Sequence, residues 1–164
     1  MKRLFFILLF SASTINLPAQ SIKIEEARKL YAKSAESRDL CRQLYTKLLE
    51  IDEKNQNLLL GYKGAVMAEM ARYEKNPPQK MKFFKEGKHK LEEAILRDFE
   101  NIELRFLRLS IQMHSPELLH YKGQITSDKA FIESNLDKLK NESLKKSISD
   151  YLVKVDKQGE LQAK

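Results

Sequence analysis

Two arginines set into an apolar segment are the residues best suited to binding chemistry. The segment NIELRFLRLSIQMHSPELL spans residues 101–119 and carries Arg105 and Arg108. Two guanidinium groups one turn apart on a helix would suit a ligand carboxylate, which they can hold through paired hydrogen bonds. Buried charges are normally paired, so carboxylates of the preceding segment could neutralise the arginines instead. The candidate partners there are Glu92, Glu93 and Asp98. Both a binding groove and an internal ion-pair network remain open.

The helical periodicity of this segment places the arginines on a narrow polar stripe that also includes Gln112. Apolar residues flank the stripe on one side at Ile102, Phe106, Leu109 and Met113, and on the other at Leu104, Leu107 and Ile111. A helix that is apolar on two faces is packed between layers, so we expect this one at the centre of the domain. The candidate groove comprises Arg105, Arg108 and Gln112, with Tyr62 and Lys63 as neighbours.

Residues for catalysis or metal binding lack the usual spacing. The histidines at 89, 114 and 120 form neither an H-x-x-x-H nor an H-E-x-x-H pattern, and Cys41 is the only cysteine. No G-x-S-x-G motif or glycine-rich phosphate loop is present, and Cys41 is expected to pack as a small buried hydrophobe. We therefore expect no metal, no cofactor and no enzyme. The alternative, an envelope enzyme, would be favoured by a pocket that joins His114 or His120 to a carboxylate.

A lysine-rich run at residues 80–90, KMKFFKEGKHK, is a second candidate surface. Its lysines scatter around a helix, whereas Phe84, Gly87, Leu91 and either Ala94 or Ile95 form one apolar face. This pattern favours a solvated helix with its apolar side in the core. A surface that binds anionic lipid or polysaccharide is the alternative.

The elements that position these residues are expected to be helices. Glycine and proline are scarce, with 5 and 4 residues, and Leu, Lys, Glu and Ala are abundant. Helices are predicted at 22–34, 37–51, 57–74, 79–98, 101–114, 116–124, 127–139 and 142–157. The breaks are marked by NPPQ at residues 76–79 and by Ser115-Pro116, which resembles an N-cap followed by proline at the first helical position. The predicted fold class is all-α.

The N-terminus has the pattern of a secretory signal peptide. Lys2 and Arg3 precede the apolar run LFFILLF, and a polar stretch ends near Ala19. We predict a signal peptide at 1–19, a single helical domain at 20–157 and a frayed tail at 158–164. Loss of Lys2 and Arg3 would reduce the net charge from +7 to +5, which is mild for a nucleic-acid binder. The apolar run is too short for a membrane span, so no stable membrane insertion is expected after cleavage.

Two sets of residues resemble known families. A small-aromatic-small pattern like that of a tetratricopeptide repeat can be placed on Gly87, Leu91 and Ala94, and again on Cys41, Tyr45 and Leu48. The strings GYKGAVMAEMARY, KFFKEGKHKLEEAI, NIELRFLRLSIQ and SDKAFI, within residues 58–132, resemble a family of uncharacterised exported proteins of Bacteroidota. That resemblance implies a small tetratricopeptide-like domain in the cell envelope, periplasmic or secreted, and implies no reaction.

Together these features predict stacked antiparallel helical hairpins in an exported binding or scaffolding protein. Such a short solenoid commonly holds a peptide on its concave face. The expected partner is a protein or peptide segment of acidic character, bound without catalysis, and nucleic acid is not expected.

Overall fold

The computed structural model describes residues 22–162, so the predicted signal peptide lies outside the described residues. All regular elements in this range are helical, which confirms the all-α class. The α-helices are α1 (Ile24–Ser34), α2 (Arg38–Leu48), α3 (Asn57–Tyr73), α4 (Pro77–Arg97), α5 (Ile102–His114), α6 (Ile125–Asn135) and α7 (Glu142–Gln162). Two short 3-10 helices are η1 (Glu117–Leu119) and η2 (Leu136–Lys138).

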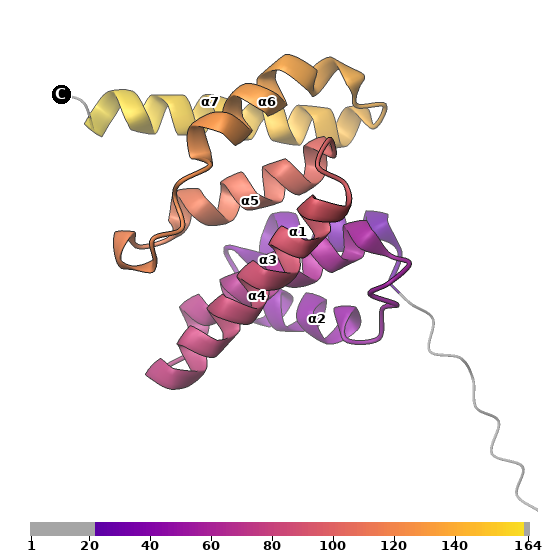
Figure 1. Ribbon diagram of the computed structural model, residues 1–164, viewed down its shortest axis with the longest axis vertical. Coiled ribbons are helices and arrows are strands. Elements are labelled where there is room, and N and C mark those ends of the chain that lie inside the picture. Colours follow the sequence, from indigo (N-terminus) through magenta and orange to yellow (C-terminus); the bar gives the residue numbers. More distant parts are fainter. Residues whose placement is uncertain (1–21, 163–164) are drawn as a thin grey trace, which may run out of the picture.

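Helix α5 lies between two groups of helices, α1–α4 on one side and α6 with α7 on the other (Figure 1). Its Leu104, Leu107 and Ile111 join the core formed with α1–α4. Its Ile102 and Leu109 join a second core formed with α6 and α7, against which Phe106 and Met113 also pack. The prediction of a central helix with two apolar faces is therefore confirmed.

Helices α3 and α4 make the most extensive helix–helix contact of the fold. Glycines at the crossing allow this close approach. A Cβ atom added at Gly64 would lie 2.5 Å from the backbone nitrogen of Leu91, and one added at Gly87 would lie 2.6 Å from the backbone oxygen of Gly64. The small residues within α3 thus serve helix packing, as their four-residue spacing indicates.

Polar residues fix where several helices begin. Asn76 precedes Pro77 at the start of α4, and its side-chain oxygen accepts a hydrogen bond from the backbone nitrogen of Gln79 at 3.3 Å. Asn101 caps α5 in the same way, accepting from the backbone nitrogens of Glu103 and Leu104 at 3.1 Å. Each cap satisfies backbone donors that a helix end leaves unpaired.

The predicted helix at 116–124 is wrong. Pro116 is extended, with ψ 146°, and only the single turn η1 follows before His120 adopts a left-handed conformation with φ 46°. The chain then returns across α4, where the buried ring of Tyr121 packs edge-on against Phe84 at 5.8 Å and its hydroxyl donates to Glu92 at 2.6 Å. Burial of this tyrosine fixes the segment as an ordered turn.

The C-terminal helix α7 continues to Gln162, beyond the predicted end at residue 157.

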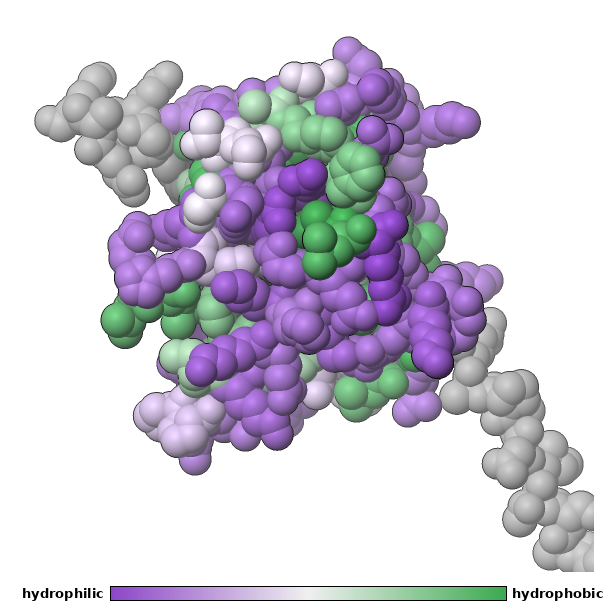
Figure 2. All heavy atoms as spheres, in the orientation of Figure 1, coloured by the Kyte–Doolittle hydropathy of each residue, from purple (hydrophilic) through white to green (hydrophobic). Residues whose placement is uncertain are grey.

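Among the described residues, no helix combines the length and apolar character that a membrane crossing requires. On the face shown in Figure 2, hydrophilic side chains predominate and apolar ones form small separate patches.

We predict that Gly64→Ala destabilises the protein by about 2–3 kcal/mol, because the new methyl group meets backbone atoms of α4 that cannot move independently. The gain in helix propensity, about 1 kcal/mol, is smaller than this cost. Urea unfolding followed by circular dichroism would measure the difference. Gly123→Ala is the control, since no atom lies within 4 Å of its added Cβ; equal stabilities of the two variants would contradict the prediction.

Candidate functional site

The two arginines of α5 converge on one carboxylate, Asp128 of α6. Arg108 donates from Nε to Asp128 Oδ2 at 2.6 Å and from Nη2 to Oδ1 at 2.7 Å. Arg105 donates from Nη1 to the same Oδ1 at 2.9 Å. Asp128 is fully buried and Arg108 nearly so, which makes this a bidentate pair with a second cation beside it.

A second carboxylate and a tyrosine extend this network toward α4. Arg108 Nη1 donates to Glu92 Oε2 at 2.7 Å, and Tyr121 donates to the other oxygen of Glu92. The guanidinium of Arg105 also lies over the ring of Phe131 at 5.1 Å. The arginines therefore form an internal ion-pair network that joins α4, α5 and α6, one of the two roles that their sequence leaves open.

The other residues of the candidate groove are buried at separate places. Gln112 is fully buried and donates to Gln124 at 3.0 Å. The hydroxyl of Tyr62 donates to Glu103 at 2.6 Å, and Lys63 forms an ion pair with Glu53 at 2.8 Å. Only Tyr62 lines the large pocket described next. The structure therefore does not bring the five candidates together on one open surface.

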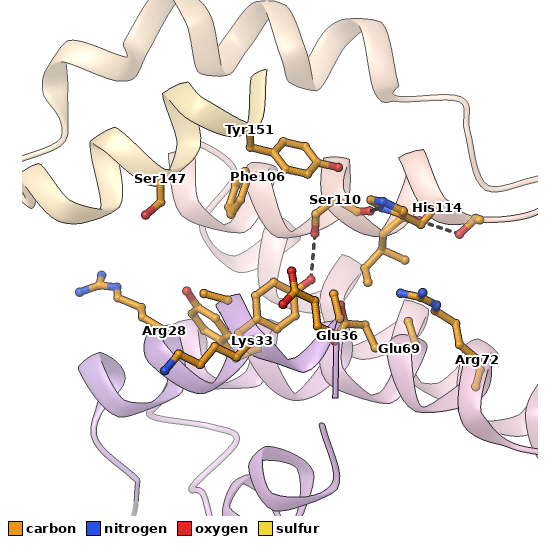
Figure 3. Close-up of a pocket in the computed structure, with 18 of the residues that line it drawn as sticks. Arg28, Lys33, Glu36, Glu69, Arg72, Phe106, Ser110, His114, Ser147 and Tyr151 are labelled. Atoms are coloured by element: carbon orange, nitrogen blue, oxygen red, sulfur yellow. Dashed lines mark hydrogen bonds between the residues drawn. The ribbon is translucent and has the colours of Figure 1, made fainter. Parts of the chain in front are cut away.

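A groove of about 1130 Å³ lies elsewhere, between α1 and α7 (Figure 3). One wall is formed by α1 and the turn that follows it, and the other by residues 143–155 of α7. Residues of α5 and α3 line the space between them, and η1 with the first turns of α4 borders one end. We call it the α1–α7 groove. Its residues from α1 and the following turn, from α5 and from α7 include Lys29, Tyr31, Ala32, Lys33, Glu36, Phe106, Ser110, His114, Leu144, Ser147, Tyr151, Lys154 and Val155.

The centre of the α1–α7 groove is mainly apolar with a few polar anchors. Phe106 and Tyr151 pack edge-on at 5.3 Å. Tyr31 and Ser110 share a hydrogen bond of 2.8 Å across the floor. The hydroxyl oxygen of Tyr151 is buried and has no hydrogen-bond partner among the described residues, although Figure 3 shows it directed along the groove toward Ser110 and His114. A buried hydroxyl without a partner is costly.

Glu69 of α3 also borders the α1–α7 groove and is 7% exposed. Burial raises its pKa to about 7, against the hydrogen bond from the Ser34 hydroxyl and the positive charge of Arg72, which both lower it. Removal from water disfavours the charged carboxylate. This residue therefore exchanges its proton near neutral pH.

The rim of the groove has an excess of unpaired positive charge. Five of its cations have no carboxylate within ion-pair distance among the described residues, namely Lys29, Lys33, Arg72, Lys80 and Lys154. Of the acids at the rim, Glu25 pairs with Arg28 and Asp150 pairs with Lys146, which leaves Glu36 as the exposed acid without a cation. The rim thus favours an anionic ligand.

The other candidates have local structural surroundings. His114 lines the α1–α7 groove together with the carboxylates Glu36 and Glu69, but its ring shares a 2.8 Å hydrogen bond with the backbone oxygen of Ser110. No histidine in the described part of the chain forms an ion pair with a carboxylate. Cys41 is buried, as expected, and burial raises the pKa of its thiol to about 12. No group of three or more potential metal ligands occurs within the described residues.

The lysine-rich helix α4 has no continuous free basic face. Phe84, Gly87, Leu91, Ala94 and Ile95 are buried as predicted. Lys90 pairs with Glu53 at 2.7 Å, and Lys88 lies over the ring of Tyr121 at 4.8 Å.

Comparisons of the chain with models of protein families, with curated proteins and with solved structures give no match.

We predict that Asp128→Ala destabilises the protein by about 3–5 kcal/mol, because it leaves Arg108 buried beside a single carboxylate. The double substitution Arg105→Glu/Arg108→Glu should prevent folding altogether. Circular dichroism and urea unfolding would measure both. The exposed Asp137, which pairs with Lys145, provides the control Asp137→Ala, for which a loss of about 0.5 kcal/mol or less is expected. Similar stabilities for the two alanine variants would contradict the buried network.

We predict that Glu69→Gln changes how stability depends on pH. Because the folded-state pKa of Glu69 is raised, the native protein holds this proton more tightly than the unfolded chain, and stability falls as pH rises from about 5 to 8. In the variant, the decrease in the free energy of unfolding between pH 5 and pH 8 should be smaller by on the order of 2 kcal/mol. Urea unfolding at several pH values would measure the slope. Glu74→Gln is the control because a backbone hydrogen bond from Asn76 lowers the pKa of Glu74, which titrates below this range; parallel slopes for wild type and Glu69→Gln would overturn the assignment.

Proposed function

We propose that this chain is a non-catalytic binding protein that holds a segment of a protein or peptide partner in the α1–α7 groove. The observation that carries the proposal is the groove itself, about 1130 Å³ with an apolar centre and few polar anchors. Ligand sites are typically concave and mainly apolar, with a small number of placed polar groups. A partner of acidic character fits the unpaired cations of its rim.

A short stack of helical hairpins, like that of tetratricopeptide proteins, is the arrangement that we propose for α1–α5. Contacts between successive helices, α1 with α2, α2 with α3 and α3 with α4, support it. Stacked hairpins build extended concave surfaces that hold peptides.

The proposed setting is the bacterial cell envelope, in the periplasm or outside the cell, after removal of a signal peptide. The apolar run LFFILLF behind Lys2 and Arg3 supports export, and the resemblance to exported Bacteroidota proteins supports a bacterial source. A scaffolding role would use the same groove.

The direct test is selection of displayed peptides on the purified mature protein, with fluorescence polarisation of the best binder. We expect the substitution Ala32→Trp to weaken binding at least tenfold, because Ala32 is an exposed residue of the groove wall and the indole would fill space between α1 and α7. A factor of ten corresponds to about 1.4 kcal/mol.

The matched control is Ala130→Trp, which places the same side chain at an exposed position of α6 outside the groove. Its affinity should equal that of the wild type. If both tryptophan variants bind equally well, or if no peptide is enriched, the α1–α7 groove is not a peptide site and the proposal fails.

A further inference from the structure

We infer that the occupant of the α1–α7 groove is an amphipathic α-helix of a partner protein, with its apolar side inward and acidic residues along its edges. This inference rests on the proposed function and specifies the conformation and charge of the bound segment.

The dimensions of the groove suit a helix of three to four turns. The groove-lining residues of α1 extend from Glu25 to Lys33, about 12 Å at 1.5 Å per residue, and the turn after α1 continues this wall to Glu36. The groove-lining residues of α7 extend from Ser143 to Val155, about 18 Å on the same basis. In Figure 3, Arg28 of α1 and Ser147 of α7 lie toward one end of the groove, and Glu36 and Tyr151 lie further along it, so the two walls run side by side. A guest helix along them would be a fourth helix beside α1, α5 and α7.

The helical walls of the groove disfavour an extended peptide segment as the bound partner. All regular elements among the described residues are helices, whose backbone groups are bonded internally, so the walls offer no strand edge. An extended peptide would bury its own amides without partners, which is costly in an apolar site. A helix satisfies its backbone internally and needs only side-chain contacts, the arrangement of known helix-in-groove complexes.

The positive charges at the rim favour a bound helix that carries negative charge. Lys29 and Lys33 lie on the α1 wall and Lys154 lies on the α7 wall, so unpaired cations border the groove on both sides. Acidic residues on the two edges of an amphipathic helix would reach them, while its apolar side contacts Phe106, Leu144 and Val155. At the η1 end, Leu118 is 82% exposed and offers further apolar contact.

Two displayed libraries of 14-residue peptides test this inference. One has no proline, and the other has proline at every fourth position and cannot form a helix. We expect binders only from the first library, with apolar residues spaced three and four apart and with Asp and Glu outnumbering Lys and Arg. The best binder should gain helical circular dichroism on binding. Its affinity should fall about tenfold in Lys33→Glu/Lys154→Glu.

The control for charge is Lys85→Glu/Lys140→Glu, which changes net charge equally at exposed positions outside the groove. Enrichment from the proline library, or binders without acidic bias that tolerate Lys33→Glu/Lys154→Glu, would overturn the helix inference while the proposed function stands. No enrichment from either library overturns both. A dimer in solution that Ala32→Trp dissociates would identify a second copy of the chain as the occupant and also overturn the inference.

Discussion

The bidentate pair between Arg108 and Asp128 is the interaction on which the arrangement of the two helix groups depends. It joins α5 to α6 at a place where both side chains are removed from water, and the neighbouring Glu92 and Arg105 balance the charge. Charges buried in this way are tolerated only when their hydrogen-bonding groups are satisfied. If the contact were apolar, α6 could shift along α5. The bidentate pair between Arg108 and Asp128 instead requires one rotation and one register of α6 on α5. The network therefore fixes the position of α6, and the core that α6 and α7 share with α5 follows from it.

A second polar junction holds the opposite face of α5. The buried carboxylate of Glu103 accepts both Arg28 Nε, at 2.8 Å, and the hydroxyl of Tyr62, at 2.6 Å, and so ties α5 to α1 and α3. Burial and this neighbouring carboxylate both raise the pKa of Tyr62, which keeps the phenol protonated as a donor. With α5 fixed on two faces, α1 and α7 are held apart on either side of it. Within residues 22–162 these two segments are bridged by a hydrogen bond at one end, where Asn141, just before α7, donates to Glu25 at 3.4 Å. The α1–α7 groove is the space left by these two attachments.

The sequence predicts the fold better than the site, for a physical reason. Apolar periodicity depends on local spacing, so the two faces of α5 and the buried face of α4 could be derived from residue order alone. The partner of Arg108 could not, because Asp128 lies twenty positions away on a helix whose placement no local pattern determines. The sequence predicts a helix at residues 116–124 because Ser115-Pro116 is a valid helix start, and the long-range burial of Tyr121 against Phe84 overrides that local signal. Likewise, the α1–α7 groove joins helices more than 100 residues apart in the chain, which a search for neighbouring charges does not reveal.

The polar features of the groove carry a cost in stability that packing alone does not explain. Tyr151 keeps a buried hydroxyl without a partner among the described residues, and burial raises the pKa of that phenol to about 12. Glu69 is held at a place where its charged form is disfavoured near neutral pH. Elsewhere the buried charged residues Glu103, Arg108 and Asp128 all have bonded partners, although the buried amide oxygens of Asn57 and Gln112 also lack hydrogen-bond partners among the described residues. Sites that depart from local consistency are typically sites of function. A ligand that accepts a hydrogen bond from Tyr151 and fills the apolar centre would remove the cost of the unpaired hydroxyl. Part of its binding free energy would therefore come from satisfying a group that is unsatisfied in the free protein.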